Sequence, residues 1–184
     1  VLVTSGKKKT GAEQRGSGGT GILLSPAAVR DWNRGGSWVK RYTHGLLAIR
    51  LSARKRRGDD SRSQDLFLIS SYSPDASKKA EERWKHLDLL DQCIKLSKQH
   101  ETLVVGTDAN VRLGIRTKLT PRRTLGPFGI PAKNPIKNHG PGIETRTLRL
   151  LESHRLCAAT TYFRSSRVGG HTTFTHRTKK AVTQ

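Results

Sequence analysis

The residues best suited to chemistry follow an apolar stretch in the middle of the chain. The sequence VVGTDAN places Asp108 and Asn110 at the end of a buried strand predicted over 102–110. Because strand side chains alternate between faces, the pattern predicts both side chains on one face. A carboxylate can orient water or hold a cation, and an amide can bind a phosphate oxygen. Asp and Asn are also ordinary turn residues, so a turn is the simpler interpretation of this pair alone.

A second strand end carries a phenol. The sequence ISSYSP places Tyr72 at the end of a strand predicted over 65–74, where its hydroxyl could contact phosphate. An amphipathic Tyr at a sheet rim is the alternative. Other polar candidates near the end of the chain are Thr160, Thr161, His171, Thr172, Thr173 and His176. Thr favours strands by itself, and an isolated His is more often structural than catalytic, so these residues alone define no site.

The elements that must position these residues alternate between strands and helices. The pattern predicts strands over 19–25, 37–44, 46–54, 65–74, 102–110, 156–163 and 171–176, and helices starting at 26, over 77–99 and over 144–154. Ser25 followed by Pro26 is typical of a helix N-cap, and Gly35-Gly36 ends that helix. This order indicates an α/β fold of the mixed sandwich type rather than a doubly wound parallel sheet. Because Tyr72, Asp108 and Asn110 all lie at the carboxyl ends of predicted buried strands, we expect them within one edge cluster of that fold.

Two predicted elements have clear apolar faces. The helix over 77–99 has an apolar stripe formed by Ala80, Trp84, Leu87, Leu90 and Ile94. The strand over 46–54 places Leu47, Ile49 and Leu51 on one face, with Ala48, Arg50 and Ser52 on the other. Both patterns predict elements with one side on the core.

The charge of the chain points to a polyanionic partner. The 184 residues include 35 Lys and Arg against 14 Asp and Glu, a net charge of +21. Such a charge destabilises a compact state unless a partner neutralises it, so nucleic acid is favoured over an anionic membrane or scaffold. A stretch without acids lies between Val111 and Gly140. Its basic residues form the predicted nucleic-acid footprint: Arg112, Arg116, Lys118, Arg122, Arg123, Lys133 and Lys137.

Composition excludes several other classes of protein. Hydrophobic residues make up 33% of the chain, and no apolar run approaches the length of a membrane span. Cys93 and Cys157 lie among apolar residues outside any CxxC pair, so buried free thiols are favoured over a zinc site, and a disulfide between them stays open. We expect a nuclear or other reducing, nucleic-acid-containing compartment, because the sequence shows no secretory signal.

Taken in order, the motifs resemble the endonuclease/exonuclease/phosphatase superfamily, and more narrowly the apurinic-type endonuclease domain of non-LTR retrotransposons. The segments that carry the resemblance are GTGILLS, LLAIRL, LFLISSYSP, TLVVGTDANVRLG, LGPFG, NHGPGIETRTLRLLESHRLCAATTYF and HTTFTHR. GTDAN stands where the family has its GD-x-N block, and HTTFTH where it has Thr-Trp-x-His. The resemblance extends over nearly the whole chain.

The resemblance implies a deoxyribonuclease I-like fold, a four-layered α/β sandwich of two sheets. It implies phosphodiester hydrolysis with a divalent ion, usually Mg²⁺. Asp108 resembles the carboxylate that orients the attacking water, Asn110 the amide on the scissile phosphate, and Tyr72 the phenol on that phosphate. No residue of this chain matches the family's metal-binding Glu or its terminal catalytic His. Glu13 lies in a Lys- and Gly-rich stretch, and His176 belongs to the Thr-x-His strand.

These observations give one expectation and two alternatives. We expect a single, incomplete domain over 1–184, with a polar, basic lead over 1–18 and a basic loop region over 111–142. This domain binds nucleic acid, has no metal site of its own and hydrolyses little or nothing. The first alternative is a degenerate relative that serves as a basic, RNA-binding component of a ribonucleoprotein, and the second is a non-catalytic subunit. Exposed sheet edges predict a larger assembly or further chain segments as cover.

Overall fold

A computed structural model describes residues 1–6, 19–52, 65–111, 113–114, 123–128 and 142–163. The chain forms two compact units, one of residues 1–111 and 136–150, the other of residues 112–135 and 151–184. Two sheets and three helices give the described residues a mixed α/β fold, as the order of elements predicts.

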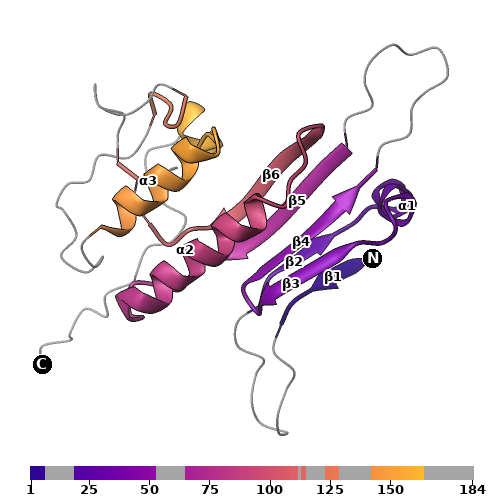
Figure 1. Ribbon diagram of the computed structural model, residues 1–184, viewed down its shortest axis with the longest axis horizontal. Coiled ribbons are helices and arrows are strands. Elements are labelled where there is room, and N and C mark those ends of the chain that lie inside the picture. The colour runs from indigo at the N-terminus through magenta and orange to yellow at the C-terminus, as the bar shows by residue number, and fades with distance from the viewer. Residues whose placement is uncertain (7–18, 53–64, 112, 115–122, 129–141, 164–184) are drawn as a thin grey trace, which may run out of the picture. The chain divides into compact units, whose positions relative to one another are not determined.

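The larger sheet has four strands in the order β3-β4-β5-β6 (Figure 1). These are β3 (Val39–Thr43), β4 (Leu46–Leu51), β5 (Asp65–Tyr72) and β6 (Glu101–Asp108). β3 and β5 run antiparallel to β4, whereas β6 runs parallel to β5. Parallel neighbours need a crossover, and α2 (Ala80–Ile94) supplies it. A buried hydrogen bond between Ser71 on β5 and His86 joins α2 to one face of the sheet. The carboxyl ends of β5 and β6 therefore meet at one end of the sheet.

A second, two-stranded sheet covers part of the other face. β1 (Leu2–Thr4) pairs with β2 (Gly21–Leu23) in antiparallel register, and α1 (Pro26–Arg34) follows β2 (Figure 1). The buried residues between the two sheets are Val3, Leu24, Leu47, Ile49 and Leu51, with Ile22, Ala28, Val29, Trp32, Val39, Leu66 and Leu68 packed around them. Removing these apolar side chains from water is the main force that holds the sheets together.

Local signals for α1 are confirmed. Ser25 is the N-cap, and its Oγ accepts a hydrogen bond from the Ala28 amide at 3.3 Å. Pro26 occupies the first turn, where a missing amide hydrogen costs nothing. Gly35 caps the other end of the helix.

The structure confirms most of both predicted apolar faces and adds buried residues to each. Residues 46–49 of β4 are all buried, and Leu47, Ile49 and Leu51 belong to the apolar cluster that β4 shares with β1, β2 and α1. The buried face of α2 includes two polar residues that the predicted stripe omits, Arg83 and His86. Trp84 is only partly buried, and its ring lies 5.2 Å from the guanidinium of Arg146.

α2 is also shorter than the helix predicted over 77–99. The Ser77 amide and hydroxyl donate to Oδ1 of Asp75 at 2.8 and 2.5 Å, a side-chain turn that delays the helix to Ala80. These two hydrogen bonds also lower the pKa of Asp75.

In the second unit, the predicted strand over 156–163 is wrong. α3 (Ile143–Ser153) enters this unit with its last three residues, and the chain then forms an isolated parallel bridge and the 3-10 helix η1 (Ala159–Tyr162). The Thr161 hydroxyl donates to the Ala158 carbonyl at 2.6 Å and accepts from the Gly126 amide at 2.6 Å. This local bonding favours a tight turn over an extended strand. The strand predicted over 171–176 lies outside the described residues.

The two cysteines differ from each other. Cys93 is a buried free thiol, as predicted, and burial raises its pKa to about 11. Cys157 is free but exposed, so the prediction of a buried thiol is wrong there, and the alternative of a disulfide is excluded in this structure. No helix in the described part of the chain is long and apolar enough to cross a membrane.

Candidate functional site

The structure places Tyr72 and Asp108 side by side. They are the last register pair of the parallel β5–β6 ladder, so their side chains leave the same face at the carboxyl end of the sheet. Both are exposed, Tyr72 by 41% of its surface. The Tyr72 amide donates to the carbonyl of Gly45 at 2.8 Å. Gly45, Tyr72 and Asp108 therefore form one row across three chain segments.

The turn before β4 fits against this row only because it contains a glycine. A Cβ at Gly45 would lie 2.7 Å from the carbonyl oxygen of Tyr72, closer than any side chain tolerates. His44 and Gly45 are the two residues that join β3 to β4. The sequence thus keeps a residue without a side chain where β5 ends.

Asn110 ties the two strand ends together. Its Nδ2 donates to the carbonyl of Ser73 at 2.8 Å, and its amide donates to Oδ1 of Asp108 at 3.2 Å. The Ser73 amide donates to the Asp108 carbonyl at 2.9 Å. Together, Tyr72, Ser73, Asp108 and Asn110 form what we call the strand-end cluster.

The backbone at Asn110 corrects one part of the sequence argument. β6 ends at Asp108, and Asn110 has φ of +46°, so the alternation of strand side chains does not extend to it. The bond from its amide to the Asp108 carboxylate is that of a side-chain turn. The turn interpretation is therefore correct for the backbone at Asn110. The turn still brings the backbone amide of Asn110 beside the Asp108 carboxylate.

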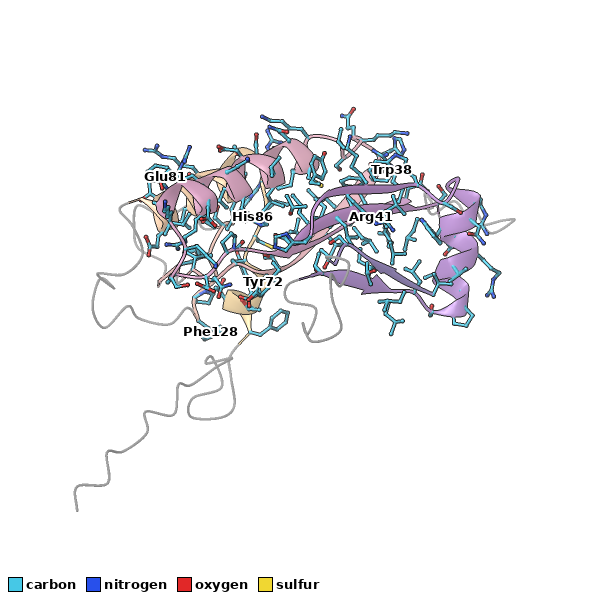
Figure 2. The ribbon with its side chains drawn as sticks, turned by 90° about the horizontal axis from the view of Figure 1, so that it is seen from below. Trp38, Arg41, Tyr72, Glu81, His86 and Phe128 are labelled. Carbon is cyan, nitrogen blue, oxygen red and sulfur yellow. The ribbon has the colours of Figure 1, made fainter. Side chains whose placement is uncertain are left out.

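Behind the cluster, a buried hydrogen bond fixes β5 to α2. Oγ of Ser71 lies 2.9 Å from Nε2 of His86, with Ser71 3% and His86 6% exposed. Burial, and then the neighbouring His44, lower the pKa of His86. Figure 2 shows His86 and Tyr72 near the same end of the sheet. Both effects favour the neutral form of the ring, whose partner Ser71 directly precedes Tyr72 in β5.

A polar junction connects the same end of the sheet to β1 and β2. The His44 carbonyl accepts from Oγ of Ser5 at 2.7 Å and from the Thr20 amide at 3.1 Å. The Thr20 and Ser70 hydroxyls are hydrogen-bonded to each other, and the Ser70 hydroxyl also donates to the Gly21 carbonyl at 3.2 Å. These bonds fix the His44–Gly45 turn against both sheets.

The predicted basic footprint is largely untested by the structure. Of its members, Arg123 lies at an exposed turn of the second unit. Arg112, Arg116, Lys118, Arg122, Lys133 and Lys137 lie outside the described residues, as do Glu13, His171, Thr172, Thr173 and His176. Thr160 and Thr161 belong to η1, where the Thr161 hydroxyl has the structural role given above.

Sequence reasoning missed His44, Ser71, Ser73 and His86. One signal was available for His86, because it falls within the spacing of Arg83, Leu87 and Leu90 on the buried face of α2, where a polar side chain needs a partner. Ser73 contributes only backbone atoms, and His44 is placed by a turn, so no residue-type pattern marks either.

Chemically, the strand-end cluster offers a phenol, a carboxylate and an amide within one exposed edge. Within the part of the chain that the structure describes, no three His, Cys, Asp or Glu side chains gather as a metal site would require. Comparisons with protein-family models, curated proteins and solved structures found no match to this chain. Function is therefore inferred from the cluster itself and from the motifs described above.

Proposed function

We propose that the chain is a nucleic-acid-binding domain related to the endonucleases of non-LTR retrotransposons, and that the strand-end cluster contacts the phosphodiester backbone. One observation carries the proposal: Tyr72 and Asp108, from two separate motifs of the resemblance, are register partners at the ends of neighbouring parallel strands. Ligands of α/β sheets commonly bind beyond the carboxyl ends of such strands. The net charge of +21 supports a polyanionic ligand.

Each side chain of the cluster has a role in this proposal. The Tyr72 hydroxyl donates to a phosphate oxygen, and the Asp108 carboxylate orients a water molecule beside the phosphorus. The Asn110 amide has one hydrogen committed to Ser73, so its second hydrogen is the one directed to phosphate. Phosphate recognition of this kind depends on positioning, which the bonds among the four residues supply.

The described residues do not fit the Mg²⁺ ion that the family resemblance implies. Mg²⁺ is held through near-octahedral oxygen ligands, and a cation held by one protein carboxylate binds weakly. Asp108 contributes such a carboxylate, but no group of three suitable side chains surrounds it among the residues described. We therefore propose binding without hydrolysis, and no step passes through a metal.

The arrangement of the two sheets also supports the proposed relationship to these endonucleases. We propose that the two sheets belong to a four-layered sandwich of the deoxyribonuclease I type. The support is that α2 covers one face of the larger sheet, while β1, β2 and α1 cover part of the other. The parallel β5–β6 pair, joined through α2, agrees with the order of the motifs.

The binding experiment measures the anisotropy of labelled DNA and RNA, single-stranded and duplex, against the chain. Tyr72→Phe should weaken binding about tenfold to a hundredfold, because a hydrogen bond to a charged group contributes roughly 1.5–3 kcal/mol. Asp108→Asn should tighten binding, because it removes a negative charge next to the phosphate. Asp65→Asn is the matched control, since Asp65 lies at the opposite end of β5. Equal effects at Asp65 and Asp108, or none at Tyr72, would reject the site.

The nicking experiment separates binding from hydrolysis. We expect the chain to retard plasmid DNA and abasic duplex in a gel, and to nick neither with Mg²⁺ or Mn²⁺. Nicking that disappears with Asp108→Ala would show that the cluster is catalytic and overturn the proposal of binding alone. Retardation of RNA but not DNA would favour the ribonucleoprotein alternative.

A further inference from the structure

One face of β6 is exposed beside the strand-end cluster, and the proposal above gives it no role. β6 lies at an edge of the larger sheet (Figure 1). Because strand side chains alternate between faces, Val104 and Gly106 lie on the face that bears the Asp108 side chain. Val104 is 48% exposed, and Gly106 is exposed as well. We call Val104, Gly106 and Asp108 the β6 strip, which is about 13 Å long at roughly 3.3 Å per residue.

The neighbouring strand is covered on this same face. Ser70, the register partner of Gly106, is hydrogen-bonded to Thr20, which directly precedes β2. Leu68, the register partner of Val104, packs against the apolar residues between the two sheets. The cover that β1 and β2 give to β5 therefore ends before the β6 strip, which borders it.

The fold does not require a glycine at position 106. A Cβ there would meet only the carbonyl oxygen of Ile69, at 3.8 Å, whereas a Cβ at Gly45 would lie 2.7 Å from Tyr72. Gly106 is also absent from the described glycines with positive φ. Glycine inside a strand weakens the strand and often marks a place where a ligand or another backbone approaches closely. No described residue makes such an approach to Gly106, and a bound ligand would.

We propose that the β6 strip is a nucleoside subsite for single-stranded nucleic acid. The nucleoside attached to the phosphate at the strand-end cluster lies along β6, with its sugar over Gly106 and its base against Val104. The inference rests on the proposed function and extends it, because it names single strands as the ligand and gives them a path. Continuity carries it, since Asp108 belongs to both the cluster and the strip. The length of the strip exceeds the roughly 3.4 Å that one nucleotide occupies in a stacked strand.

A single strand fits this strip better than a duplex or a second copy of the chain. Bases inside a duplex are stacked and paired, whereas an unpaired base can offer its face to an apolar side chain such as Val104. The strip is one strand wide, about 4.8 Å, which suits one nucleic-acid chain. A net charge of +21 attracts a polyanion and opposes the approach of a second copy.

Two substitutions test the strip in opposite directions. Gly106→Val fills the place of the sugar, and Val104→Ala removes two methyl groups from the base contact. The matched controls are Thr107→Leu and Val105→Ala, which alter the other face of the same strand. Gly106→Val should be at least as stable as the wild type in urea denaturation, because its Cβ has room and Val favours strands.

The binding experiment measures the anisotropy of fluorescein-labelled oligothymidine, an abasic single strand of equal length, and a duplex. Val104→Ala should weaken the binding of oligothymidine about fourfold to fifteenfold, since each buried methyl group contributes about fourfold. It should leave the abasic strand, the duplex and the slope of log K against log salt unchanged, because no phosphate contact is lost. Gly106→Val should weaken both single strands several-fold, because both contain the sugar. Thr107→Leu and Val105→Ala should bind as the wild type does.

The outcomes separate this inference from the proposed function. Wild-type affinity in both Gly106→Val and Val104→Ala, with Tyr72→Phe still weakened, would overturn the inference and leave the proposed function standing. Equal losses in Val104→Ala and Val105→Ala would also overturn it, because they would reflect the stability of β6. A wild-type dimer in sedimentation that Gly106→Val dissociates would assign the strip to a second copy and overturn it. A wild-type chain that binds no nucleic acid would overturn both proposals.

Discussion

Asn110 offers the sharpest test of the geometry, because two different substitutions separate its backbone from its side chain. The residue has φ of +46° and donates from Nδ2 to the Ser73 carbonyl. Replacement by Gly or by Ala removes this hydrogen bond, at a cost of about 0.5–1.5 kcal/mol. Ala, but not Gly, has a Cβ that makes the left-handed backbone unfavourable, by about 1–2 kcal/mol. Gly instead lowers the stability by about 0.4–1 kcal/mol, because it gives the unfolded chain more conformational entropy.

Adding these contributions gives an order for the two variants. Asn110→Gly should lower the free energy of unfolding by roughly 1–2.5 kcal/mol and Asn110→Ala by roughly 1.5–3.5 kcal/mol, with Ala the less stable of the two. Urea denaturation, followed by tryptophan fluorescence, measures both values. Nucleic-acid affinity should fall in each variant, because the side-chain amide that ties residue 110 to Ser73 and offers a hydrogen to phosphate in the proposal is lost. Equal stability of the two variants would refute the left-handed backbone at Asn110, and wild-type stability in both would refute the bond to Ser73.

Two further predictions concern a buried imidazole behind the cluster and an ion pair toward the opposite end of the larger sheet. Burial lowers the pKa of His86, so the unfolded chain binds a proton that the folded chain excludes, and stability should fall below about pH 6.5 by up to about 1.4 kcal/mol per pH unit. Urea midpoints measured above and below that pH should show a smaller decrease for His86→Gln than for the wild type. The Nε of Arg50 lies 2.7 Å from Oε1 of Glu101, with the two side chains only 18% and 2% exposed. Arg50→Met leaves the Glu101 carboxylate buried without its cation and should lower the free energy of unfolding by about 3–5 kcal/mol. The double variant Arg50→Met, Glu101→Gln should recover most of that loss. A double variant no more stable than the single one would contradict this account.

The sequence predicts the elements of this fold better than their contacts. Ser25 and Pro26 mark the start of α1 because capping is local, and the apolar run before Asp108 marks β6 for the same reason. The extended prediction for 156–163 fails because a hydrogen bond of Thr161 closes a turn, and strand propensity does not include that competition.

In the candidate site, too, local sequence patterns indicate some features and not others. Strand ends predict Tyr72 and Asp108 at one edge of the sheet, but that they are direct register partners follows from the parallel pairing of β5 and β6, which no local pattern contains. The bond from Asn110 to Ser73 involves a backbone carbonyl, so the residue type at position 73 carries no signal of it. His86 was detectable in principle, since it interrupts an apolar stripe.

The two sheets are joined in different ways along their length. At the end that bears the cluster they meet through the hydroxyls of Ser5, Thr20 and Ser70, and further along they meet through Val3, Leu47 and Ile49. A polar bond contributes about 1 kcal/mol net, whereas each buried apolar side chain contributes roughly 1.5–3 kcal/mol. Local unfolding should therefore begin at the polar end, with rapid amide hydrogen exchange at Thr20 and slow exchange at Ile49. The two sheets should therefore separate first at the end that bears the strand-end cluster.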